Sequence, residues 1–274
     1  MRNRILVAVV FLPVLFVVLF FLPPYALAVL LVIVCAISSY ELLHAIGAKE
    51  SKMVTAYAIV SAAIIPVGAY FAVGEFVFAA VFLALLCVVF AEAIMVFKTD
   101  KHITFEQIMT TVFAGVLIPI LLSSLVRLRN MPEGHVLVFL PFLSAFITDA
   151  GAYFTGIFLG KHKAFPFISP KKTVEGYIGG LAIGTAVIIL YGVLLKNVTD
   201  FEIRYWALIV YGVVGAVFTE LGDLAFSFIK REYDLKDYGS LLPGHGGMLD
   251  RFDSMVFAAP AMYLMVQVLP AVRS

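Results

Sequence analysis

One polar segment of this sequence, residues 227–253, carries side chains suited to phosphate and metal chemistry between two long apolar runs. A charged cluster beside membrane-length segments is costly unless it has a function. Near its end stand Asp250 and Asp253, three residues apart. A helix that starts near Leu249 would place both carboxylates on one face. The segment is therefore the first place to look for a site.

Carboxylates in and beside the apolar runs predict a magnesium site. Asp149 lies well inside one run, and Asp223 shares a helical face with Glu220, Ser227 and Lys230 near the end of another. Hard divalent cations prefer oxygen ligands, and Mg²⁺ typically takes one or two carboxylates together with phosphates and water. The predicted ligands are Asp223, Asp250, Asp253 and Asp149, and a second cation is left open. Zinc is not expected, because no His/Cys cluster occurs.

Basic residues in two places predict phosphate contacts. Residues 169–172 read as a helix start, with Ser169 at the N-cap and Pro170 in the first turn, and helix N-termini attract anions. The lysine pair there, Lys171 and Lys172, is equally typical of a loop that only sets membrane topology. In the polar segment, a glycine-rich turn over residues 244–247 could direct backbone N–H groups at a phosphate.

The polar segment resembles the signature of the phosphatidate cytidylyltransferase family, also called CDP-diacylglycerol synthases. The residues that carry the resemblance are Ser227, Lys230, Arg231, Lys236, Asp237, Gly239, Pro243, His245, Gly246, Gly247, Asp250, Arg251 and Asp253. The similarity continues upstream through residues 169–176 and through Asp149, Tyr153, Phe154 and Gly156. By motif it covers roughly the C-terminal half of the chain.

The resemblance implies transfer of a cytidylyl group from CTP to phosphatidic acid, which yields CDP-diacylglycerol and pyrophosphate. The predicted catalytic residues are Asp223, Asp250, Lys171, Lys172, Lys230 and Arg231. The predicted substrate-binding residues are Ser169, Thr173, Ser227, Lys236, Asp237, His245, Gly246, Gly247 and Arg251. A CTP-dependent lipid-alcohol kinase is the nearest alternative, and it would release CDP instead of pyrophosphate.

Composition places the chain in a bilayer. Hydrophobic residues make up 63% of it, only 14% are charged, and the mean hydropathy is +1.06. We expect an all-α polytopic membrane protein with about nine spans. The expected spans are Ile5–Leu22, Tyr25–Leu43, Val54–Val73, Phe76–Phe97, Ile108–Leu128, Val136–Leu159, Tyr177–Leu195, Tyr205–Phe228 and Phe252–Leu269. Pro23-Pro24 should break the chain between the first two, since neither residue can donate a helix hydrogen bond.

The spans divide into two expected halves: a scaffold, residues 1–130, and a catalytic half, residues 131–274. The first five spans are nearly free of buried charge, with Glu92 the main exception. In the seventh span, Gly176, Gly180 and Gly184 recur every fourth residue, a spacing that favours close helix packing.

Lysine and arginine placement predicts an inner-membrane protein whose N-terminus and polar segment are cytoplasmic. In that orientation only Arg127, Arg129, Lys196, Arg204 and Arg273, of nineteen Lys and Arg residues, fall outside. The expected partners are CTP, phosphatidic acid and the bilayer, with a homodimer as the candidate assembly. A net charge of +1 argues against nucleic acid. A transporter is disfavoured, because the charge gathers at one membrane face and no repeat occurs.

Overall fold

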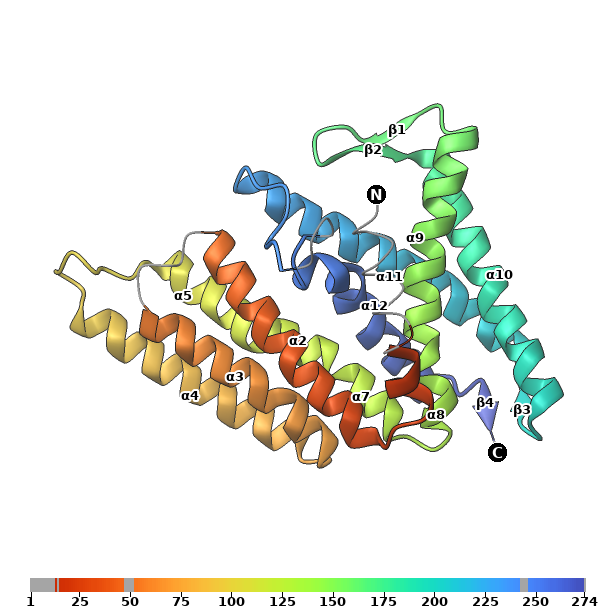
Figure 1. Cartoon of the computed structure of the whole chain (residues 1–274), viewed down its shortest axis with the longest axis horizontal. Coiled ribbons are helices and arrows are strands. Elements are labelled where there is room, and N and C mark those ends of the chain that lie inside the picture. Colours follow the sequence, from red (N-terminus) through yellow and green to blue (C-terminus); the bar gives the residue numbers. More distant parts are fainter. Residues whose placement is uncertain (1–12, 14, 47–51, 242–245, 274) are drawn as a thin grey trace. The chain divides into compact units, whose positions relative to one another are not determined.

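The computed structural model describes residues 13, 15–46, 52–241 and 246–273 (Figure 1). Its helices are α2 (Pro24–Ala45), α3 (Lys52–Tyr70), α4 (Gly74–Met95), α5 (Phe105–Val112), the π-helical η2 (Phe113–Leu117), α6 (Ile118–Leu122), α7 (Ser124–Arg129), α8 (Gly134–Leu137), α9 (Phe139–Leu159), α10 (Val174–Val198), α11 (Tyr205–Glu232) and α12 (Leu249–Val268). The strands are β1 (Lys163–Phe165), β2 (Ser169–Thr173), β3 (Glu202–Ile203) and β4 (Val272–Arg273).

The predicted fold class, an all-α polytopic membrane protein, is confirmed. Among the described residues, seven helical stretches are long and apolar enough to cross a bilayer. They correspond to the second through eighth predicted spans. Half of the first predicted span, Ile5–Leu22, lies outside the described residues. The ninth forms α12, which is not among the seven, so the total of nine stays a prediction.

The chain forms two compact units. Unit 1 comprises residues 1–130 and 235–252, and unit 2 comprises residues 131–234 and 253–274. The division after Asn130 falls where the charge pattern changes. Residues 235–252, however, leave the C-terminal half and belong to unit 1. The first turn of α12 therefore lies in unit 1 and the rest of that helix in unit 2.

In unit 1, α2 packs on α3 and α3 on α4, around a core that includes Leu31, Ala58 and Ile65. The chain turns at residues 21–23 and α2 begins at Pro24, so the predicted proline break is confirmed.

Farther along, Pro119 lacks the N–H that would continue an α-helical ladder. The preceding turn widens instead, and the Ile118 N–H bonds the Phe113 carbonyl in a π-helical pattern.

In unit 2, α10 packs against α9 and α11. The predicted glycine packing is confirmed, because an added Cβ on Gly176 would lie 2.8 Å from the Ala152 carbonyl oxygen. The same addition on Gly180 would come within 2.9 Å of the Thr148 carbonyl oxygen. Side chains at these glycines would force the helices apart.

The short strands β3 and β4 pair antiparallel and join the end of α12 to the turn between α10 and α11.

The predicted helix start at residues 169–172 is wrong. Ser169–Thr173 forms β2, which pairs antiparallel with β1 in a hairpin that projects from the ends of α9 and α10 (Figure 1). The cap of α10 is Thr173, whose hydroxyl oxygen accepts the Gly176 N–H at 3.1 Å. Strand pairing and this later cap together displace the helix start by several residues.

Candidate active site

A cavity of about 610 Å³ in unit 2 gathers many of the predicted site residues. The helices α9, α10 and α11 and the β1–β2 hairpin form its wall. Its polar and aromatic lining residues include Asp149, Tyr153, Lys163, Ser169, Lys171, Lys172, Thr173, Tyr177, Glu220 and Asp223. The cavity thus combines cationic side chains, which can hold phosphates, with carboxylates, which can hold a hard cation.

An ion pair joins two predicted catalytic residues in this cavity. The Lys172 ammonium donates a hydrogen bond to the Asp223 carboxylate, and both side chains are about one-quarter exposed. The ammonium also lies 5.3 Å from the centre of the Tyr177 ring. Burial lowers the pKa of Lys172 below its ordinary value, and the charges of Asp149, Asp253 and Glu220 oppose that shift. The pair therefore places opposite charges next to each other in a partly buried site.

A second group of polar contacts surrounds Asp253 in α12. The Lys230 ammonium lies 3.9 Å from Asp253 Oδ2, and both side chains are nearly buried. Ser254 Oγ donates to Asp149 Oδ2 at 3.2 Å, while the Ser254 N–H donates to Asp253 Oδ1 at 2.7 Å. Ser254 therefore connects two predicted metal ligands, and no motif in the sequence marks it for this role.

The β1–β2 hairpin is fastened at both ends. At its base, Glu175 accepts the backbone N–H groups of Lys161 and His162, at 3.0 and 3.2 Å. Toward its tip, Arg231 Nε of α11 donates to the Ile168 carbonyl oxygen at 3.1 Å. Predicted to contact phosphate, Arg231 here tethers the strand connection that carries the lysine pair. The hairpin thus holds Lys171 and Lys172 at the cavity wall.

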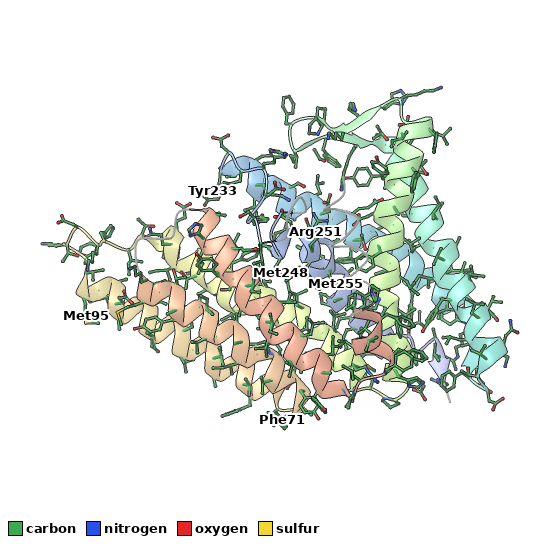
Figure 2. All side chains as sticks on the ribbon, viewed as in Figure 1. Phe71, Met95, Tyr233, Met248, Arg251 and Met255 are labelled. Atoms are coloured by element: carbon green, nitrogen blue, oxygen red, sulfur yellow. The ribbon has the colours of Figure 1, made fainter. Side chains whose placement is uncertain are left out.

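The polar segment 227–253 is not one loop. Ser227, Lys230 and Arg231 lie in the last turns of α11, which ends at Glu232, four residues beyond the predicted end at Phe228. Basic side chains at this end interact favourably with the helix dipole. Lys236 and Asp237 are exposed in unit 1, and Arg251 is exposed in the first turn of α12 (Figure 2). Pro243, Gly244 and His245 lie outside the described residues.

Asp250 organises the unit 1 part of this segment. Its Oδ2 accepts the backbone N–H groups of Tyr238 and Gly247, at 2.8 and 2.9 Å. Gly246 has a φ of +80°, a conformation that glycine adopts without strain. The predicted start of α12 at Leu249 is confirmed. Asp250 lies in the first turn of α12 and Asp253 directly follows that turn, and their contacts lie in different units.

The statement that Glu92 is the main buried charge of the first five spans is wrong. Glu92 is only partly buried, whereas Glu41 of α2 is 5% exposed and contacts the start of α12. The sequence gives no local signal for this contact, since the two partners are more than 200 residues apart. Only the presence of an acid inside an apolar run could have drawn attention to it.

Oxygen ligands near the cavity fit a hard cation. Asp149, Glu220 and Asp223 line the same cavity, and the Glu220 Oε1 atom is buried without a hydrogen-bond partner. Within the described ranges, no three His, Cys, Asp or Glu side chains converge closely enough to hold a metal by themselves. Such a set suits Mg²⁺, which usually keeps water and substrate phosphates among its ligands.

Comparisons with known proteins agree with a site built from these lysines and carboxylates. A model of the cytidylyltransferase family matches residues 2–269. The phosphatidate cytidylyltransferase of Bacillus subtilis is 39% identical over 164 residues, 60% of each chain. Proteins of the same name from Staphylococcus saprophyticus and Staphylococcus aureus are 42% and 43% identical over 134 and 136 residues, in each case 49% of this chain and 50% of the relative. The matched stretches thus span 50–60% of the relatives' lengths.

Proposed function

Because this chain belongs to the cytidylyltransferase family, we propose that it transfers a cytidylyl group from CTP to phosphatidic acid. The products are CDP-diacylglycerol and pyrophosphate. The observation that carries the proposal is the unit 2 cavity, where lysines and carboxylates meet among membrane-spanning helices. The names of the relatives supply the substrate pair.

The reaction is a substitution at the α-phosphorus of CTP, with the lipid phosphate as nucleophile. A phosphate monoester is already anionic near neutral pH, so the site needs no strong base. It must bring two anionic substrates together and stabilise the departing pyrophosphate, which is a task of charge neutralisation and positioning. We assign phosphate contacts to Lys171 and Lys172 on β2 and to Lys230 and Arg231 on α11.

Mg²⁺, when bound, would neutralise phosphate charge and help to align the reacting groups. We assign its protein ligands to Asp223 and Asp250, with Asp253 and Asp149 as further carboxylates. In the structure, Asp223 and Asp253 each face a lysine. Substrate phosphates would compete for those lysines, and the carboxylates would then be available to a cation. The same lysines thus keep the acidic side chains compensated until substrate arrives.

A second, apolar hollow of about 400 Å³ supports access from the lipid phase. It shares Tyr177 and Glu220 with the polar cavity. Its remaining lining is apolar and comes from the hairpin, α10 and α11: Ala164, Phe165, Val174, Val217, Leu221 and Leu224. We propose that an acyl chain of phosphatidic acid lies here while the phosphate enters the polar cavity. Burial of each methylene contributes about 0.8 kcal/mol.

The chain is a multi-pass membrane protein, and we propose that it resides in the bacterial inner membrane with the N-terminus and residues 227–253 in the cytoplasm, where CTP is. A homodimer is a further proposal, which the mass of the detergent-solubilised protein would test. Expected partners are thus the bilayer and the two substrates.

The test of the activity uses purified protein, CTP labelled at the α-phosphorus, and phosphatidic acid in mixed micelles. The label should move into a chloroform-soluble product, with one pyrophosphate released per lipid. Release of CDP with a lipid alcohol as acceptor would identify a kinase instead. Failure of both reactions with Mg²⁺ present would overturn the proposed function.

A further inference from the structure

Glu41 is a buried acid in a membrane-spanning helix of unit 1, and only 5% of its surface is exposed. It lies near the end of α2, and α2 is one of the seven spanning stretches. A charged side chain within a span is costly unless protein groups or water compensate it. The surroundings of Glu41 therefore show what keeps it there.

Both carboxylate oxygens of Glu41 bond the start of α12. Oε1 accepts the Met248 N–H and Oε2 accepts the Leu249 N–H, each at 2.9 Å. The first N–H groups of a helix have no partners within the helix, and they lie at the positive end of its dipole. A carboxylate is the strongest natural partner for such groups. Glu41 thus acts as an N-terminal cap supplied by a distant helix.

The segment before α12 is shaped to admit this side chain. A Cβ atom on Gly239 would lie 2.5 Å from Glu41 Oε1, and one on Gly247 would also overlap the carboxylate. Asp250 meanwhile accepts the Tyr238 and Gly247 N–H groups from within the segment. Two carboxylates therefore fix the described residues on either side of α12's start, 238–239 and 246–250, one from the segment itself and one from α2.

We propose that Glu41 is a positioning residue for the reaction: it holds residues 247–249 at the start of α12 so that Asp250 and Arg251 keep the geometry that catalysis requires. It acts through the backbone of α12 and does not contact the reacting atoms. This role rests on the proposed function for its kinetic part, while the hydrogen bonds can be tested without any activity.

The first measurement is hydrogen–deuterium exchange of the purified full-length protein. Glu41→Gln keeps the size of the side chain but removes its charge and places an amide N–H₂ against a backbone donor. The peptide that covers residues 246–250 should then exchange at least ten times faster than in the wild type. Glu75→Gln, a change of an exposed acid in the first turn of α4, is the matched control and should leave that peptide unchanged. Unchanged exchange in Glu41→Gln would overturn the proposal.

The second measurement separates kcat from KM. Displacement of catalytic groups by about 1 Å can cost roughly 10²-fold in rate, so Glu41→Gln should lose kcat on that order with little change in the KM for CTP. Glu41→Asp retains the charge on a shorter side chain. Compared with Glu41→Gln, it should recover part of the protection of residues 246–250 from exchange and part of the kcat. Faster exchange with a wild-type kcat would show that the reaction does not need the anchor. If the wild type itself transfers no cytidylyl group, the proposed function fails, while the exchange result still decides whether Glu41 holds the segment.

Discussion

The Lys172 ammonium donates a hydrogen bond to the Asp223 carboxylate, although the two residues lie 51 positions apart. One was predicted to hold phosphate and the other to hold a metal ion, and in the structure their charges compensate each other. Removal of one member of such an ion pair destabilises the folded protein strongly, because the other charge is left without its partner. A variant that loses one of these two charges should therefore be less stable than a variant that loses both.

The lysine pair should contribute unequally. Lys172→Gln leaves Asp223 uncompensated and removes a phosphate contact, so turnover should fall by at least 10²-fold. Lys171 is exposed at the cavity wall, and Lys171→Gln should lower turnover by about tenfold. The assay is pyrophosphate release by protein that inserts and purifies normally. Lys196→Gln, in the last turn of α10, is the control and should keep full activity. Wild-type rates for both cavity variants would mean that these lysines only set topology.

Asp223 and Asp250 should behave as a unit if both serve one metal ion. Asp223→Asn, Asp250→Asn and the double variant should be about equally inactive, because groups that act together are not additive. Asn at position 250 retains an oxygen acceptor for the Tyr238 and Gly247 N–H groups, so expression should be normal. The measurement is the rate against Mg²⁺ concentration, with chelator abolishing wild-type turnover.

The matched control for these acids is Asp200→Asn, an exposed position between α10 and β3, which should retain the wild-type dependence on Mg²⁺. A near-normal rate for Asp223→Asn with an unchanged Mg²⁺ dependence would remove Asp223 from the metal site. Independent losses that multiply in the double variant would show that the two carboxylates do not share an ion.

The apolar hollow beside the cavity should determine the affinity for lipid. Leu224→Trp would fill part of it, so the KM for phosphatidic acid should rise about tenfold while the KM for CTP stays constant. The two constants are measured in mixed micelles, with the lipid given as its surface fraction. Leu190→Trp, an exposed position on α10, controls for the added indole. Equal effects on both substrates would argue against an acyl-chain site.

The orientation can be tested by cysteine labelling in a background that lacks Cys35 and Cys87. Single cysteines at Lys163 and Ser240 should react with an impermeant maleimide only from the cytoplasmic side. A cysteine at Asn130 should react only from outside. The expectation follows from the lysine and arginine asymmetry. If the cysteine at position 240 reacts from outside, residues 227–253 do not face the cytoplasm, and the proposed access of CTP to them is wrong.

Local sequence signals predicted most of the helices well. Apolar length located seven spanning stretches, the proline pair located the break before α2, and the glycine spacing predicted close packing of α10, which the structure shows against α9. These features depend on residues within one or two turns of each other. The upstream part of the family resemblance also identified residues on β2 and α9 that the fold brings to one cavity, and the polar face of α11 identified Asp223 there.

Features that depend on distant partners were missed. Residues 169–172 have the composition of a helix start, yet pairing with β1 makes them a strand and leaves the cap to Thr173. Nothing near Glu41 in the sequence indicates that it bonds the start of α12. The sequence likewise holds no local signal for the contacts of residues 235–252, which belong to unit 1.

The contact between Glu41 and Met248 also has a consequence for biogenesis. The ribosome must add 207 residues after Glu41 before the N–H group of Met248 exists, which takes about 10–40 s at ordinary elongation rates. During that interval α2 enters the membrane with an acid whose final partners have not been made. A nascent chain that stops short of α12 therefore carries a polar defect in α2 that membrane proteases could recognise, so truncated products should be cleared faster than the finished protein.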